Sequence, residues 1–227
     1  MKRANRETFR SGRSRPHVVL VRHGETEWSR DGRHTGRTDV PLTEVGRREA
    51  RMLAARLRVW RFAEIVSSPL RRALETCRLA GYGDVVEVRD ELLEWDYGDY
   101  EGRTTADIRT EHPGWTIWAA GAPGGERAED VGARVDPLVA ELREAQGDVA
   151  VFGHGHLLRV LAARWLDLPA HQGRAFALGT TTVSVLGFER ETPVILRWNE
   201  DCHLGPHGAQ VLAPESATEG GADLADD

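Results

Sequence analysis

Short apolar runs rich in β-branched residues alternate with longer segments of helical periodicity, and this alternation constrains the fold most. The apolar runs are HVVLV (17–21), EIVSS (64–68), DVVEV (84–88) and DVAVFG (148–153). Each is short enough for a strand and is bounded by turn or polar residues. Strands that alternate with helices pack as a layered domain. The sequence therefore predicts a three-layer α/β/α fold with a mainly parallel central sheet.

Capping residues and apolar spacing place the helices between these strands. One helix follows Thr43 as its N-cap, with these residues at helical spacing: Val45, Met52, Leu53, Leu57 and Trp60. A second begins at Pro69 and shows one apolar face: Leu70, Ala73, Leu74 and Cys77. Further helices are expected over 104–111, 126–145 and 154–168. Pro137 should kink or restart the 126–145 helix, with Asp136 as a cap. Two β-like runs, 175–188 and 193–198, close the fold.

Length and composition indicate one folded domain with polar ends. The chain has 227 residues, 40% of them hydrophobic and 29% charged, as is typical of a globular protein. We expect a disordered basic arm over 1–15, one domain over 16–200, and a mostly disordered acidic tail over 201–227. Cys77 and Cys202 form no disulfide framework or zinc pattern.

The same composition bears on location and partners. No run approaches the roughly 18 apolar residues of a membrane span, and the basic start lacks the apolar segment of a secretion signal. We therefore expect a cytoplasmic protein without a membrane partner. The arginine-rich start lacks aromatic interleaving, so we expect no nucleic-acid partner either.

Arginine and histidine follow directly where the predicted strands end. VLVRHG places Arg22 and His23 after the first strand, and VAVFGHG places His154 after the fourth. Ligands bind at the carboxyl ends of parallel strands, so the two histidines should lie at one edge and can face each other. EIVSS leads into Arg71 and Arg72 at the start of a helix, where anions are favoured. The pattern predicts an anion pocket.

Four motifs in order, RHGETEW, SSPLRRALET, EWDYGDYEG and FGHGHLLR, resemble those of the histidine phosphatase superfamily. The resemblance is to the branch that includes the cofactor-dependent phosphoglycerate mutases, and it spans about residues 17–190. It implies a phosphoglycerate mutase-like fold and phosphoryl transfer through a phosphohistidine. No cofactor and no metal ion are expected. Family members are often dimers, so a homodimer is compatible with the resemblance.

The resemblance implies a role for each matched position. His23 would be the nucleophile, Glu94 would protonate the leaving oxygen, and the phosphate would be surrounded by Arg22, Arg72 and His154. A neutral imidazole can attack phosphorus without a separate base, and neighbouring cations favour that form by lowering its pKa. Fixed donors around the phosphoryl oxygens would do the work of the metal in kinases.

Two of these assignments rest on the position within a motif. Arg72 is preferred to Arg71 because the family's arginine directly precedes the alanine of the motif. His154 is preferred to His156 because the family's histidine is the first in HGH. An H-x-H pair also suits a metal ion, but no carboxylate-rich ligand set lies near it in the sequence.

Departures from the mutase pattern favour hydrolysis. Where the mutases carry a lysine after the acid's motif, this chain has Thr105, and their following pair of arginines has no counterpart in GWTIWAAGAPGGE. Those cations hold the carboxylate of phosphoglycerate. The motifs look most like those of sedoheptulose 1,7-bisphosphatases and broad-specificity acid phosphatases. We predict a metal-independent phosphomonoesterase that acts on small phosphorylated metabolites, with sugar phosphates foremost.

The substrate side is predicted from fewer residues. Ser29 stands where many members carry asparagine, and its hydroxyl can hydrogen-bond a phosphate oxygen. By the resemblance, Thr35 and Gly36 line the substrate side of the pocket. Arg33 and Arg37 are nearby cations that could meet a second phosphate.

Other interpretations stay open. The chain could be a phosphoglycerate mutase, or a non-catalytic module that binds phosphate for regulation, and a protein-phosphatase role is also open. The remaining histidines are interpreted as structural or solvated: His17, His34, His112, His171, His203 and His207. Three tryptophans are interpreted as packing residues, although the last two lie in a stretch that could cover the pocket: Trp95, Trp115 and Trp118.

Overall fold

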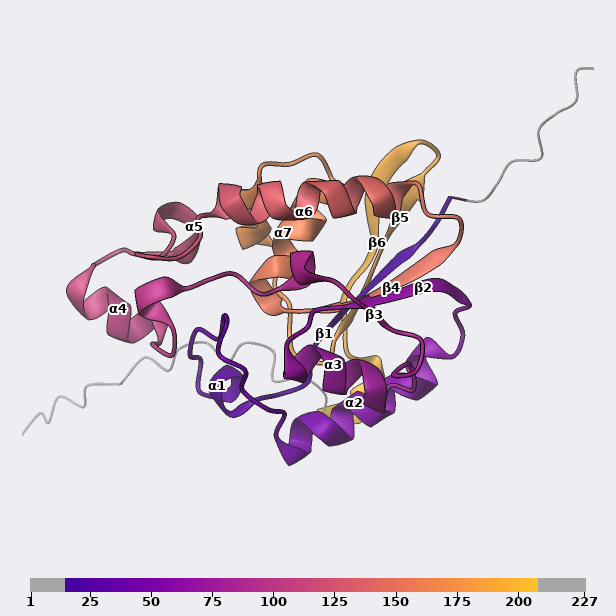
Figure 1. Ribbon diagram of the computed structural model, residues 1–227, viewed down its shortest axis with the longest axis horizontal. Coiled ribbons are helices and arrows are strands. Elements are labelled where there is room, and N and C mark those ends of the chain that lie inside the picture. Colours follow the sequence, from indigo (N-terminus) through magenta and orange to yellow (C-terminus); the bar gives the residue numbers. More distant parts are fainter. Residues whose placement is uncertain (1–14, 208–227) are drawn as a thin grey trace, which may run out of the picture.

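The computed structural model describes residues 15–207, which fold around one six-stranded sheet between two helical layers (Figure 1). The strands are β1 (Val18–Arg22), β2 (Phe62–Ser67), β3 (Glu87–Val88), β4 (Asp148–Gly153), β5 (Val183–Glu189) and β6 (Thr192–Glu200). Their order is β3-β2-β4-β1-β5-β6. The first four strands pair in parallel, β5 pairs antiparallel with β1, and β6 pairs antiparallel with β5. The predicted α/β fold with a mainly parallel sheet is confirmed.

Two pairs of helices cover the two faces of the sheet. Helices α2 (Glu44–Leu57) and α3 (Arg71–Leu79) lie on one face, and α6 (Ala128–Arg143) and α7 (Gly155–Trp165) lie on the other (Figure 1). Side chains alternate along a strand. In β1, Val18 and Leu20 therefore pack in one core while Val19 and Val21 pack in the other.

Shorter helices lie beyond the carboxyl ends of the parallel strands. Figure 1 shows α1 (Glu27–Arg30), α4 (Thr105–Glu111) and α5 (Ile117–Ala120) on the side of the sheet where β1 ends. Four 3₁₀ helices complete the described chain: Asp90–Leu92, Gly98–Tyr100, Ala170–Ala175 and Cys202–His207. These segments frame the edge at which the site forms.

Helix α2 begins as predicted but presents a different face to the core. Thr43 caps it by accepting a hydrogen bond from the Gly46 amide at 3.0 Å. Leu53 and Leu57 are buried, whereas Val45 is 37% exposed and Met52 40% exposed, so the apolar residues at helical spacing do not all face the core. The first turn of the helix lies close against the preceding loop at Gly46, where a Cβ atom would lie 2.3 Å from the carbonyl oxygen of Glu25.

Helix α6 runs unbroken past Pro137, so the predicted restart of the helix was wrong. Asp136 is not a cap, because its carboxylate accepts hydrogen bonds from Arg164 Nε at 2.7 Å and from Nη2 at 3.1 Å. The predicted apolar stripe of this helix is buried, and its packing holds the helix together through the proline: Val131, Val135, Leu138 and Leu142.

Most differences from the prediction concern the residues at which helices and strands begin and end. Strand β3 has two residues instead of the predicted 84–88. Strand β5 begins at Val183, later than the predicted start at 175, and residue 175 itself ends the Ala170–Ala175 3₁₀ helix. The helix predicted from Pro69 begins at Arg71, with Leu70 as its N-cap. Most of the two predicted disordered ends lies outside the described residues, but 202–207 form a 3₁₀ helix. Within 15–207, no helix has both the length and the apolar character needed to cross a bilayer.

Candidate active site

His23 and His154 come together because their strands are neighbours. In the parallel pair β1–β4, Arg22 is opposite Gly153, and the His23 amide donates to the Gly153 carbonyl at 3.0 Å. Each histidine is the first residue after its strand. Their ring centroids are 5.2 Å apart, and His23 is 4% exposed while His154 is fully buried. The edge predicted from the strand ends is therefore where the two imidazoles meet.

The His23 ring has one defined tautomer. Its Nδ1 lies 2.7 Å from the carbonyl oxygen of its neighbour Gly24. A carbonyl can only accept, so Nδ1 carries the proton and Nε2 keeps its lone pair. Burial, together with the charges of Arg72 and Arg22, holds the pKa of His23 well below its usual 6.5. The ring is therefore neutral at physiological pH, with a basic nitrogen left free.

Arg22 has an unused donor next to His23. Its Nη1 donates to the Leu178 carbonyl at 2.5 Å, while its Nε is buried and has no acceptor among the residues described. The space for this guanidinium depends on Gly155, where an added Cβ would lie 3.3 Å from both Cζ and Nε of Arg22. The glycine of HGH thus lets the arginine pack against the start of α7.

Arg72 is fully buried and uses four of its five N–H groups. Its Nε donates to His154 Nδ1 at 3.2 Å, and its two Nη atoms donate to the carbonyls of Thr38 (2.9 Å), Gly36 (2.8 Å) and Thr35 (3.0 Å). One guanidinium therefore joins α3, the 35–38 loop and the second histidine.

His154 is held from both sides. Because Arg72 only donates, His154 Nδ1 must accept, and the neutral ring carries its proton on Nε2, which lies 2.7 Å from Ser68 Oγ. Burial is the main reason that the pKa of His154 is well below 6.5, and Arg72 adds to it. His154 thus presents a neutral donor beside His23.

The Glu94 carboxylate rests on the first turn of α7. Oε1 accepts from the amides of Trp95 (2.9 Å) and Leu157 (2.8 Å), and Oε2 accepts from the amide of His156 (3.1 Å). A negative charge is favoured at a helix N-terminus. Glu94 is 4% exposed and lines the same cavity as His23.

The active-site cavity has a volume of about 460 Å³. Arg22, His23 and Glu94 line it, whereas Arg72 and His154 lie behind His23 and do not. The predicted catalytic set is thus divided between three residues at the cavity wall and two buried residues that contact them or their neighbours.

The residues predicted for the substrate side differ in their placement. Ser29 and Thr35 line the cavity, and Gly36 does not. The Ser29 hydroxyl accepts from the Thr26 amide at 2.9 Å in the capping box of α1, and it already donates to the Thr26 carbonyl at 3.0 Å. The Gly36 amide donates to Glu101 Oε1 at 2.8 Å, and a Cβ there would lie 2.5 Å from the Trp95 carbonyl.

The two candidate cations near this loop, Arg33 and Arg37, also differ in their placement. Arg33 lines the cavity. Arg37 instead lies 3.6 Å from Asp96 Oδ2 and 3.7 Å from Glu126 Oε2, so its charge is already paired.

Several cavity residues were given no role from the sequence: His34, Tyr97, His156, Arg159 and Arg174. Thr105, which the sequence analysis placed on the acceptor side, also lines the cavity. His34 was interpreted as structural or solvated, yet it faces the cavity, 3.3 Å from Thr105 Oγ1, and burial lowers its pKa to about 4. Tyr97 Oη lies 2.6 Å from His156 Nδ1. Tyr97 lies in the motif of Glu94, and His156 and Arg159 lie in the motif of His154. Their closeness in sequence to those two residues could therefore have identified them as cavity residues.

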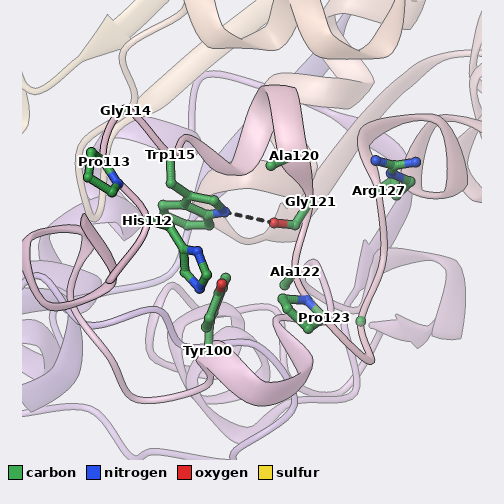
Figure 2. A pocket seen from close by; sticks show the side chains of 11 residues that line it. Tyr100, His112, Pro113, Gly114, Trp115, Ala120, Gly121, Ala122, Pro123 and Arg127 are labelled. Atoms are coloured by element: carbon green, nitrogen blue, oxygen red, sulfur yellow. Dashed lines mark hydrogen bonds between the residues drawn. The ribbon is translucent and has the colours of Figure 1, made fainter. Parts of the chain in front are cut away.

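A second cavity of about 610 Å³ lies apart from His23, around Tyr100, His112 and Trp115 (Figure 2). It contains none of the predicted site residues. Trp115 Nε1 donates to the Gly121 carbonyl at 3.0 Å, which fixes this ring as a packing residue. Trp118 lies elsewhere, with its ring centroid 5.1 Å from that of His156. Within 15–207, no three metal-ligating side chains are grouped to hold an ion.

Comparison with known proteins is consistent with this geometry. The sequence profile of the histidine phosphatase superfamily (branch 1) matches residues 18–201. An acid phosphatase of Mycobacterium tuberculosis is 43% identical over 76% of this chain and 86% of its own length. A sedoheptulose 1,7-bisphosphatase of Saccharomyces cerevisiae is 37% identical over 67% of this chain and 68% of its own. The solved structure of an M. tuberculosis open reading frame product, 40% identical, superposes with a TM-score of 0.77 over 81% of this chain and 97% of its own.

Proposed function

The chain belongs to the histidine phosphatase superfamily (branch 1) and is a phosphatase, and from this premise we propose that it hydrolyses small phosphomonoesters through a phosphohistidine on His23. Sugar phosphates are the proposed substrate class, in keeping with the yeast relative. The observation that carries the proposal is the free Nε2 of a neutral His23 beside the unused Nε of Arg22.

The first half-reaction forms one bond and breaks one. Nε2 of His23 attacks phosphorus, and the P–N bond forms as the ester P–O bond breaks. Glu94, in its protonated form, donates to the leaving oxygen, so that the alcohol departs neutral. In the second half-reaction, Glu94 as a carboxylate takes a proton from water, whose oxygen attacks phosphorus and releases phosphate and His23.

Charge stabilisation comes from the guanidiniums. Two unit charges 4 Å apart at an effective dielectric constant of 20 interact by about 4 kcal/mol. Arg22 can direct its unused Nε–H at a phosphoryl oxygen, and Arg72 has one N–H left for the same use. His154 would donate through Nε2–H on exchanging its contact with Ser68 for the phosphate.

Hydrolysis is favoured over mutase activity by the acceptor side of the cavity. Thr105, at the position where mutases carry lysine, lies against His34 at 3.3 Å and supplies no positive charge. A mutase must hold its released intermediate for re-phosphorylation, and Thr105 does not supply the cation that the mutases place at this position for that purpose. Water is therefore the proposed acceptor.

The test measures phosphate release from p-nitrophenyl phosphate and a panel of sugar phosphates, with EDTA present throughout. We expect turnover by the wild type, none by His23→Ala, and wild-type rates for the matched surface variant His112→Ala. Mass spectrometry of quenched enzyme should find one added phosphoryl group on the peptide that contains His23. Efficient interconversion of 3- and 2-phosphoglycerate with little phosphate release would overturn the proposal, and activity abolished by EDTA would refute its metal independence.

A further inference from the structure

Arg134, on α6, uses its whole guanidinium next to the segment that carries the proposed proton donor. Its Nη1 donates to the carbonyls of Glu91 (2.7 Å) and Leu93 (2.8 Å), and its Nη2 donates to the carbonyl of Glu94 at 3.5 Å. Its Nε and Nη2 also donate to the two carboxylate oxygens of Glu126, at 2.9 and 3.0 Å. All five N–H groups of the guanidinium therefore have acceptors.

These bonds take the place of the support that a helix or strand would give to the main chain of Glu94. Residues 93–97 belong to no helix and no strand, yet Glu94 is 4% exposed and its side chain lines the active-site cavity. A buried carbonyl needs a hydrogen-bond donor. One guanidinium supplies that donor at three positions of the 91–94 segment. The placement of the Glu94 main chain therefore depends on Arg134.

Glu126 extends the same support to the residues that follow Glu94. Its Oε2 accepts from the Asp96 amide at 2.8 Å, its own amide donates to the Asp96 carbonyl at 2.9 Å, and its carbonyl accepts from Trp95 Nε1 at 2.8 Å. The side chains of Arg134 and Glu126 are only 19% and 18% exposed, so water screens this bidentate ion pair little. The pair thus holds the chain on both sides of Glu94.

The ion pair lies behind the cavity wall. Neither Arg134 nor Glu126 lines the active-site cavity, whereas the Glu94 carboxylate lies at its wall on the amides of His156 and Leu157. Those amides fix the head of the Glu94 side chain from α7, and Arg134 fixes its main chain from α6. The proton donor is therefore held between two helices, and one of its two anchors is a single side chain.

We propose that Arg134, paired with Glu126, is a positioning residue that places Glu94 within reach of the leaving oxygen of the substrate. This inference rests on the proposed function, in which Glu94 protonates that oxygen. An acid must lie within hydrogen-bond distance of its acceptor, and a misplacement of about 1 Å can cost about a hundredfold in rate. Loss of the guanidinium leaves three carbonyls without their donor, so the Glu94 carboxyl moves from that distance while His23 and Arg22 keep their places.

The experiment compares two substrates that differ in their need for an acid. One is the sugar phosphate that the wild type hydrolyses fastest, and the other is p-nitrophenyl phosphate, whose nitrophenolate leaves without a proton. Arg134→Gln should lower kcat for the sugar phosphate about ten- to a hundredfold and kcat for p-nitrophenyl phosphate less than about threefold. KM for the sugar phosphate should change little, because Arg134 does not line the cavity. A merely structural role would lower both rates in the same proportion.

A double-mutant cycle shows whether Arg134 acts through Glu94. In the Glu94→Gln background, Arg134→Gln should lower kcat for the sugar phosphate by less than about twofold, because the proton donor is already gone. Arg134→Lys keeps a positive charge beside Glu126 but not the planar fork. It should recover part of the rate that Arg134→Gln loses.

Arg143→Gln is the matched control on the same helix. Arg143 follows Arg134 by nine residues, about 13.5 Å along the axis of α6, and it too donates to main-chain carbonyls, at the end of α7, and pairs with Asp167. The variant should lose thermal stability and keep the wild-type ratio of the two rates. Glu126→Gln keeps the size of the side chain and one acceptor oxygen. It should change the ratio in the same direction as Arg134→Gln but less, and it decides the question if Arg134→Gln does not fold.

The outcomes separate this inference from the proposed function. The positioning role is overturned by equal losses for the two substrates in Arg134→Gln, by a full further loss in the Glu94→Gln background, or by a changed ratio in Arg143→Gln, and hydrolysis through His23 then stands. If Glu94→Gln itself lowers both rates equally, Glu94 is not the acid, and the positioning role falls with that assignment alone. If the wild type hydrolyses no phosphomonoester, both proposals fall.

Discussion

Arg72 and His154, 82 residues apart in the sequence, are joined by a 3.2 Å hydrogen bond from Nε to Nδ1. The bond connects the start of α3 to the end of β4, and it fixes the tautomer of the second histidine. The same guanidinium satisfies three carbonyls of the 35–38 loop. One buried side chain therefore orders the wall behind His23 and one side of the cavity.

Replacement of Arg72 by lysine should strongly reduce both activity and stability. An ammonium cannot reproduce the planar fork that bonds His154 and three carbonyls at once. We expect kcat/KM for p-nitrophenyl phosphate to fall about a hundredfold or more, and the free energy of unfolding to fall by about 1–3 kcal/mol from unpaired buried acceptors. Arg71→Lys is the control, because the Arg71 side chain is 60% exposed. Equal losses in the two variants would contradict the assignment of Arg72.

Glu94→Gln should discriminate between leaving groups. An alkoxide needs a proton as it departs, whereas nitrophenolate is stable without one. We expect kcat for a sugar phosphate to fall about a hundredfold and kcat for p-nitrophenyl phosphate to fall much less. Glu91→Gln, three residues earlier, should change neither rate. If Glu94→Gln affects both substrates equally, Glu94 acts in binding and not as the acid.

The pH dependence of kcat/KM should reveal the neutral nucleophile. Burial, Arg72 and Arg22 lower the pKa of His23, so the ring stays unprotonated when the solution becomes mildly acidic. Activity should therefore persist below pH 6.5, with its acid limb under that value. Arg22→Gln removes one of the causes and should move the limb upward, as measured with p-nitrophenyl phosphate in constant ionic strength. An acid limb at or above pH 6.5 in the wild type would contradict a depressed pKa.

The same burial should make folding stability depend on pH. Four histidines have pKa values that lie well below 6.5 in the folded state, so the unfolded chain takes up protons first as the pH falls: His23, His34, His154 and His156. Stability is full above pH 6.5 and is lost below it. Between pH 7.0 and 5.5 the loss should be about 1.3 kcal/mol for each of these histidines, or about 5 kcal/mol in total.

Urea unfolding at the two pH values measures this loss. His34→Gln should reduce the pH-dependent part by about one quarter, since the folded pKa of His34 is about 4. A free energy of unfolding that is flat over this range would show that the four rings are protonated in the fold.

The fold and much of the site could be predicted because local signals agreed with the tertiary structure. His23 and His154 each follow a predicted parallel strand. Because ligands bind where such strands end, the sequence was enough to predict that the two imidazoles meet. The exposure of Val45 and Met52 on α2 could not be predicted, because apolar spacing does not tell which residues of a stripe the rest of the chain covers. The assignment of Asp136 as a cap was wrong because its partner, Arg164, is distant in sequence. The pairing of Arg37 with Glu126 could not be foreseen for the same reason.

The carboxylate of Glu94 rests on the amides of His156 and Leu157, and the helix that provides those amides starts directly after His154. A movement of α7 would therefore shift Glu94 and His154 together, and the separation between the proton donor and the second imidazole would be kept. The loops at the mouth of the cavity can then differ between substrates without changing the positions of these two groups.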